Sequence, residues 1–208
     1  DENRLGSLTL AGILKMSNKS MIDSHKSDLA STIAHLTNLN NKTNTSNGIF
    51  ESITGEIKLD TRKRRLEIDT PKTVVAVIQD DSRLVQLGPL QISALSAPAL
   101  VALTAIDDKP LTSSRHMLLI LVSDALNTDM RFEDASRKKL LTLGRLPARL
   151  NPMTMKFSLK TIEGDVQVSP LSLAGKKHES TLQKAGLLSI DWRTQSYGPT
   201  IYYEIEIK

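Results

Sequence analysis

From residue 49 to the C-terminus, apolar and polar positions follow one another in short runs that predict β-strands. Segments such as GEIKLD and RRLEID change polarity at every second residue, which is the period of a strand with one buried face. The run TVVAVIQ is apolar almost throughout, which is typical of a strand buried on both faces. Turn-forming residues separate these runs at spacings of roughly ten residues. The pattern predicts an all-β fold, an antiparallel β-sandwich or a partly open barrel.

The first 48 residues have a different pattern. Leu29, Ile33 and Leu36 have the spacing of one helix face, and Asp23 or Ser24 is a suitable N-cap. The segment NLNNKTNTSNG then consists almost entirely of turn formers. We therefore expect a short N-terminal helical segment and linker over residues 1–48, followed by a β-sandwich domain over residues 49–208.

The segment Asp-Thr-Pro-Lys-Thr interrupts the strand pattern between two expected strands. Pro71 cannot donate a backbone hydrogen bond, and it disfavours a helical conformation at Thr70. Asp69 and Thr73 have side chains that commonly hydrogen-bond nearby backbone. These four residues predict a structural corner after a charged hairpin tip at residues 61–65, and the next strand then enters the core.

The amino-acid composition excludes several classes of protein but does not identify a function. The chain has 208 residues, 39% of them hydrophobic and 24% charged, with a net charge of +4, which is ordinary for a globular protein. It contains no Cys, so a disulfide framework, a thiolate metal site and a Cys nucleophile are excluded. No apolar run approaches the ~18 residues of a membrane span. The chain begins with DENRLGS, without an initiator Met or a signal peptide, so we expect a mature form or a piece of a longer protein.

Few residues in the sequence are candidates for catalysis, metal binding or nucleic-acid binding. The basic runs at residues 62–65 and 137–139 are not interleaved with aromatic residues, so they predict solvated tips and no nucleic-acid partner. His116 stands at the start of an apolar strand and is expected to be structural, and no His pair has metal-ligand spacing. Adjacent acids occur in turn-like segments, and no carboxylate pair suggests a glycosidase centre. We therefore expect no cofactor, no metal and no catalytic residue in this chain, and whether it is part of an enzyme stays open.

Exposed aromatic residues are the usual platform for sugar binding. Only 3% of the residues are aromatic, which disfavours a dedicated carbohydrate-binding module. Trp192 and Tyr197 flank an expected turn and are the candidate binding residues, with the alternative that Trp192 and one Tyr fill the core. Tyr202 and Tyr203 are neighbours on a strand, so one of them points inward and the other outward.

Several segments in order resemble a C-terminal β-rich accessory domain of bacterial glycoside hydrolases of the agarase or cellulase type, which have a catalytic (β/α)-barrel. The segment TGEIKLDTRKRRLEIDTPKT resembles the block that follows the barrel. The segment around Asp107-Asp108-Lys109-Pro110-Leu111 and the ending ALNTDM resemble the next block, and PTIYYEIEI resembles the terminal strand. The match spans roughly residues 50–208. It departs from the family at Leu59, near which the family has Trp, and at Asp129, where it has Gly.

The resemblance implies a non-catalytic sandwich that buttresses a catalytic barrel and helps to line a polysaccharide groove, in a secreted or cell-envelope protein. Its expected partners are its own catalytic domain or another protein, with polysaccharide as a further ligand. The alternative is a free-standing carbohydrate-binding or protein-interaction module of the bacterial envelope. A third hypothesis is a small hydrolase, which would need two carboxylates to converge in one pocket, with or without His116. The accessory-domain hypothesis predicts an apolar face that is exposed in the isolated chain. The hypothesis of a free-standing module predicts that Trp192 and Tyr197 are exposed together on one surface.

Overall fold

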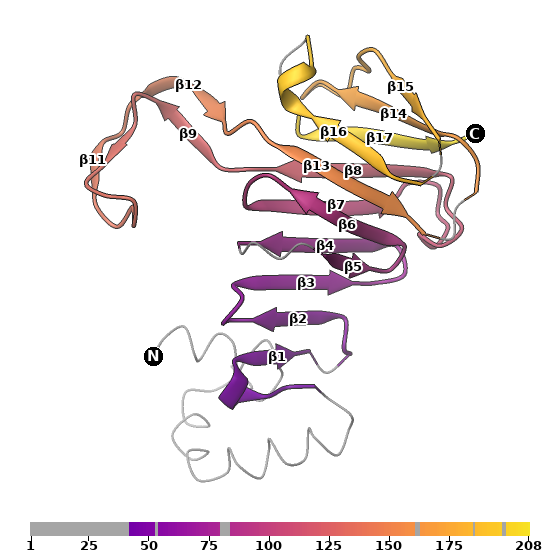
Figure 1. The fold of residues 1–208 in the computed structure, drawn as a ribbon, viewed down its shortest axis with the longest axis horizontal. Coiled ribbons are helices and arrows are strands. Elements are labelled where there is room, and N and C mark those ends of the chain that lie inside the picture. The colour runs from indigo at the N-terminus through magenta and orange to yellow at the C-terminus, as the bar shows by residue number, and fades with distance from the viewer. Residues whose placement is uncertain (1–41, 53, 80–83, 161–162, 185, 197–198) are drawn as a thin grey trace.

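The computed structural model describes residues 42–52, 54–79, 84–160, 163–184, 186–196 and 199–208. Antiparallel strands dominate these residues, and the sheets do not close into a barrel (Figure 1). This confirms the predicted all-β sandwich class. The predicted helix and the first residues of the linker that follows it, up to residue 41, lie outside the described residues. Within the described residues, no helix is long and apolar enough to cross a membrane.

The larger layer of the fold is a nine-stranded antiparallel sheet. Its strand order is β1-β2-β3-β4-β7-β8-β17-β14-β15. The strands in this order are β1 (Ile49–Glu51), β2 (Ile57–Asp60), β3 (Arg65–Asp69), β4 (Thr73–Ile78), β7 (Ala99–Ala105), β8 (His116–Val122), β17 (Tyr202–Ile207), β14 (Val166–Leu171) and β15 (Thr181–Gln183).

A four-stranded sheet forms the smaller layer, with the order β16-β13-β6-β5. Its strands are β16 (Leu188–Asp191), β13 (Thr154–Leu159), β6 (Leu90–Leu95) and β5 (Val85–Leu87). The hydrophobic core lies between the two sheets, where Val74 and Leu119 of the large sheet belong to the same buried cluster as Ile92 and Phe157 of the small one. The small layer is narrower than the large one, and β1 and β2 extend beyond it (Figure 1).

The chain turns between β3 and β4 at the predicted corner. The Thr70 hydroxyl donates to the Thr73 carbonyl at 2.7 Å and accepts from the Thr73 N–H at 3.0 Å. The Thr73 hydroxyl instead pairs with Thr104 on β7, and Asp69 accepts from the distant Gly88 N–H at 3.1 Å. The side chain that holds the turn is therefore Thr70, and the expected local bonds of Asp69 and Thr73 are replaced by contacts to neighbouring elements.

The described end of the predicted linker is attached to the sheet. Thr45–Asn47 form a 3-10 turn that Asn44 caps, and Asn44 then pairs with Ile49 in a β-bridge. The Glu51 N–H donates to the Thr43 hydroxyl at 3.0 Å, and Thr43 is buried. Residues 42–48 therefore form a short hairpin with β1.

A two-stranded arm, residues 125–150, projects from the end of β8 (Figure 1). Its proximal part pairs β9 (Ala125–Thr128) with β12 (Arg145–Leu150), and its distal part pairs β10 (Arg131–Phe132) with β11 (Leu140–Thr142). The arm bends between these parts at Gly144, where φ is +72° and an added Cβ would lie 2.3 Å from the Thr128 carbonyl oxygen. Only glycine fits this crossing without strain.

The two faces of β8 predict a matched stability test. Leu119 is fully buried between the sheets, whereas its neighbour Leu118 points to the opposite face and is half-buried. We expect Leu119→Ala to lower the free energy of unfolding by about 2–5 kcal/mol and Leu118→Ala by about 1 kcal/mol or less, as measured by urea denaturation of the 208-residue chain. Equal losses at the two positions would show that both faces are covered in the isolated chain.

Candidate functional site: the outer face of the large sheet

The strand register identifies a second apolar face on the nine-stranded sheet. Val74, Ala76 and Ile78 of β4 point into the core, so Val75 and Val77 point to the opposite side. Directly paired residues of antiparallel strands share a face, which extends this assignment strand by strand across the sheet. We call this side the outer face. Its apolar residues on β2, β3, β4, β7, β8 and β17 are Ile57, Leu59, Leu66, Ile68, Val75, Val77, Leu100, Ala102, Leu118, Ile120, Val122 and Tyr202.

The side-chain polarity of β2 and β3 differs between the two faces of the large sheet. On these strands the core-side positions are charged, with Lys58 opposite Glu67 and Asp60 opposite Arg65. The outer-face positions are apolar, with Ile57 opposite Ile68 and Leu59 opposite Leu66. A strand with one solvated face places its polar residues toward water. The polarity of β2 and β3 therefore favours a covering layer on the outer face. On the core side, Arg65 and Glu67 pair with each other, and their side chains are 11% and 20% exposed.

The outer face is a broad apolar surface on the side of the large sheet away from the core. Its residues on β2, β3, β4 and β8 are all half-buried, and the small sheet lies on the other side. Six strands at their usual spacing give an apolar area of roughly 400 Å². This is within the range of about 300–600 Å² that is typical of the largest patch on a monomer, and such patches are often functional.

One end of the outer face is hollowed by the arm. A cavity of about 650 Å³ is lined by Val77, Leu100 and Val122 of the outer face and by Ala135 and Arg137 of the distal loop of the arm. The Arg137 guanidinium reaches back to the Asp124 carboxylate at 2.5 Å, which ties this loop to the base of the arm. The arm thus borders the apolar face on the side where β8 ends.

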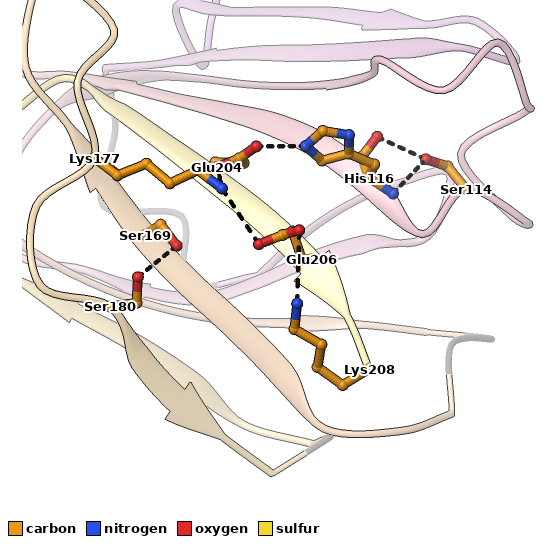
Figure 2. Close-up of polar contacts among 8 residues, drawn as sticks. All are labelled: Ser114, His116, Ser169, Lys177, Ser180, Glu204, Glu206 and Lys208. Carbon is orange, nitrogen blue, oxygen red and sulfur yellow. Dashed lines mark hydrogen bonds and ion pairs between the residues drawn. The ribbon is translucent and has the colours of Figure 1, made fainter.

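The opposite end of the outer face carries a cluster of ion pairs, shown in Figure 2. His116 Nε2 lies 2.5 Å from Glu204 Oε1, and the Lys177 ammonium pairs with the carboxylates of both Glu204 and Glu206. Lys208 lies 3.6 Å from the other oxygen of Glu206. An apolar centre with a polar border is the usual anatomy of a protein interface.

The electrostatics of this cluster favour its charged state. Burial alone would raise the pKa of Glu204, but hydrogen bonds from Lys177 and His116 and their charges outweigh it, so the Glu204 pKa lies below its ordinary value. The hydrogen bond to Glu204 raises the pKa of Lys177 above its ordinary value, against the opposing effect of burial. Both groups are therefore ionised at neutral pH.

Two chemical readings of the cluster can be tested against its geometry. His116, Glu204 and Glu206 offer ligand atoms that lie within 4.8 Å of one another, close enough to share a metal ion. The Lys177 ammonium already pairs with both carboxylates, so a metal would have to compete with it. As it stands, the arrangement is a network of ion pairs.

A Ser-His-Glu triad is the second reading, because Ser114 lies beside His116. The Ser114 hydroxyl donates to the His116 backbone carbonyl at 3.0 Å, and the His116 backbone N–H lies 3.3 Å from the same hydroxyl oxygen. Ser114 is only 1% exposed and is bound to the backbone, not to the imidazole (Figure 2). A nucleophile needs its hydroxyl on the imidazole base, so these three residues do not form a catalytic triad.

The aromatic residues proposed for sugar binding do not form an exposed pair. Trp192 is 3% exposed and belongs to the core cluster, so its ring face is not available for stacking. Tyr197 lies outside the described residues. Tyr203 points into the core and Tyr202 to the outer face, which is the division expected from their adjacency.

The two basic runs lie at surface turns. Residues 62–64 are exposed at the β2–β3 turn, whereas Arg65 belongs to β3 and pairs with Glu67 at 3.5 Å. Residues 137–139 lie in the distal loop of the arm, where Arg137 contacts both Asp124 and the ring of Phe132.

Polar residues next to Trp192 line a separate pocket of about 510 Å³ at one end of the sandwich. Asp191, Thr194, Gln195 and Ser196 contribute to it, and Tyr203 lies at its apolar side. The Gln195 amide donates to the Tyr203 hydroxyl at 2.8 Å, while its oxygen has no hydrogen-bond partner among the described residues.

The Glu204 and Glu206 pair and the leucines of the arm were not identified from the sequence. The alternation YYEIEI does place both Glu residues on one strand face, which is the available signal. Their partners come from segments 29 and 88 residues away, so the cluster depends on sheet order. Comparisons of the chain with family models, curated proteins and solved structures found no match.

The cluster predicts a pH-dependent stability. A carboxyl whose pKa is lowered on folding adds stability above its unfolded pKa, near 4.5 for Glu204, and loses it as the pH falls through the folded value. We expect Glu204→Gln to lower the free energy of unfolding by about 1–2 kcal/mol at pH 7, with the difference shrinking below pH 4.5. Thermal unfolding between pH 3 and pH 7 measures this, with the exposed Glu179→Gln as control. A difference that is the same at pH 3 and pH 7 would contradict the assignment.

Proposed function

We propose that this chain is a non-catalytic β-sandwich domain that docks through its outer face against a second folded domain. The resemblance of residues 50–208 to the accessory domain of barrel glycoside hydrolases indicates that this second domain is a catalytic barrel. In that arrangement the sandwich buttresses the barrel and helps to line a polysaccharide groove. A secreted or cell-envelope location remains a prediction that accompanies this proposal.

The observation that carries the proposal is the polarity of the nine-stranded sheet. Strands β4, β7 and β8 are apolar on both sides, and β2 and β3 are apolar on the outer side and charged on the core side. Burying the outer face would remove roughly 400 Å² from water, which at about 25 cal/mol per Å² amounts to about 10 kcal/mol before the costs of association. A second folded domain supplies such a cover.

Thiol labelling tests the docking face directly, because the chain contains no Cys. Ile120→Cys places one thiol on the outer face, Leu119→Cys places one in the core, and Leu173→Cys places one at a position that is 83% exposed. In the 208-residue chain, we expect maleimide to label Ile120→Cys within about tenfold of the rate of Leu173→Cys, and Leu119→Cys far more slowly.

The same variants are then labelled in the product of the complete open reading frame. We expect labelling of Ile120→Cys to slow by at least about tenfold there, with Leu173→Cys unchanged. A reading frame without a second domain, or equal labelling of Ile120→Cys in both forms, would overturn the docking proposal. Slow labelling in the 208-residue chain would show that the outer face is already covered.

Carbohydrate binding is a second candidate function, supported by the pocket beside Trp192. Its lining of hydroxyl, amide and carboxylate groups over an apolar floor suits a polyhydroxylated ligand. Trp192→Ala would remove a core residue, so Gln195→Ala is the appropriate variant.

We expect a sugar-binding domain to show heat on calorimetric titration with cellohexaose or xylohexaose and to lose affinity by about tenfold in Gln195→Ala, corresponding to about one hydrogen bond. Lys160→Ala, next to Gln86 of β5, serves as a control variant because Lys160 does not line the pocket. Absence of binding to both oligosaccharides at millimolar concentration would remove this candidate for these sugars.

A further inference from the structure

The arm carries a group of leucines that its own fold does not bury. Leu140, Leu141, Leu143 and Leu146 are 45%, 52%, 64% and 80% exposed, respectively. All four lie within seven residues around the bend at Gly144. Scattered exposed leucines are common, but four within seven residues of one projecting ribbon are a local concentration of exposed apolar side chains.

Polar contacts, rather than these leucines, hold the arm in its shape. The Thr128 hydroxyl donates to the Pro147 carbonyl at 2.8 Å, and Asn127 donates to the Leu143 carbonyl at 3.1 Å. Arg145 pairs with Asp129 at 3.1 Å across the bend. The leucine side chains are therefore left for a contact outside the arm.

The arm also has an excess of positive charge. Residues 125–150 contain six Arg or Lys and three Asp or Glu, a net charge of +3. The cations Arg137, Lys139 and Arg145 are paired with carboxylates of described residues. Arg131, Lys138 and Arg149 are exposed and form no ion pair with a described residue, so they are available to carboxylates of a partner.

The arm is continuous with the outer face. The cavity at the end of that face is lined jointly by Val77 and Leu100 of the sheet and by Ala135 and Arg137 of the arm. One side of a stable interface buries about 800 Å², and the sheet alone offers roughly half of this. A body seated on the outer face would meet the arm at its edge, and the arm leucines would supply further area.

We propose that the arm clamps the domain that covers the outer face, by laying its leucines in an apolar groove of that domain bordered by Asp and Glu side chains. This inference rests on the proposed docking function and adds the second contact and its chemistry. The continuity of the arm with the outer face favours such a protein partner over a lipid surface. The net charge of +3 on the arm disfavours pairing with the arm of a second copy, which would carry the same charge.

Labelling of thiols on the arm tests the clamp separately from the docking face. Leu141→Cys and Leu143→Cys are compared with Leu173→Cys as an exposed control and with Ile120→Cys on the outer face, after thermal unfolding has shown that each variant is folded. We expect both arm thiols to react as fast as the control in the 208-residue chain. In the product of the complete reading frame, we expect them to react at least about tenfold more slowly.

The charge of the groove is tested in the same product. Arg131→Glu combined with Lys138→Glu places carboxylates against the expected acidic border, so labelling of Leu143→Cys should become faster again, while labelling of Ile120→Cys changes less. If the charge reversal leaves the labelling rate of Leu143→Cys unchanged, the prediction that Asp and Glu side chains border the groove is wrong.

Four outcomes would overturn the clamp. Protection of Ile120→Cys without protection of the arm thiols would leave the docking function standing and remove the clamp, whereas protection of neither would remove both. Sedimentation of the 208-residue chain with vesicles of phosphatidylcholine and phosphatidylglycerol, lost in Leu141→Ser combined with Leu143→Ser, would assign the leucines to a membrane surface instead. Arm thiols that are protected in the 208-residue chain and become reactive on dilution would assign them to a second copy.

Discussion

Alternation of side chains across the nine-stranded sheet is the constraint on which the rest of the structure depends. Because successive residues of a strand point to opposite faces, the register that places Val74, Ala76 and Ile78 in the core also commits Val75 and Val77 to the outer face. A one-residue slip would exchange the two sets. The small sheet covers one side only and is narrower than the large one (Figure 1). The small sheet thus completes the hydrophobic core on one side of the large sheet. The outer face is a second apolar surface, on the side that the small sheet does not cover.

The remaining features are arranged around that surface. The ion pairs of His116, Glu204 and Lys177 lie where β8 begins, and the arm projects where β8 ends, so the apolar centre has a polar border on one side and a wall on the other. Glu204 and Lys177 stay ionised over a wide pH range because each lowers the free energy of the charged form of the other. Such a border adds orientation and specificity to an apolar contact more than it adds affinity.

The all-β class and most strands of the sandwich could be predicted because their signals are local. The alternation of RRLEID, the break at Gly88-Pro89 and the Asp-Thr-Pro corner each depend on a few neighbouring residues. The prediction that TVVAVI is a strand buried on both faces was wrong for one face, because Val74, Ala76 and Ile78 are buried whereas the apolar residues of the outer face are only half-buried. Burial of Trp192 with one Tyr was an alternative given by the sequence. The partners of Asp69 and Thr73 and the cluster around Glu204 depend on which strands are neighbours, and sequence spacing does not contain that information. The arm was missed because its leucines resemble core positions unless the fold shows that no layer lies against them.

The most direct test of the account is an experimental structure of the product of the complete open reading frame. The account predicts that Leu66 and Ile120, which lie on strands at opposite sides of the outer face, are both buried against another folded domain. A structure in which the outer face is open to solvent, or is covered by residues 1–41 of this chain, would contradict it.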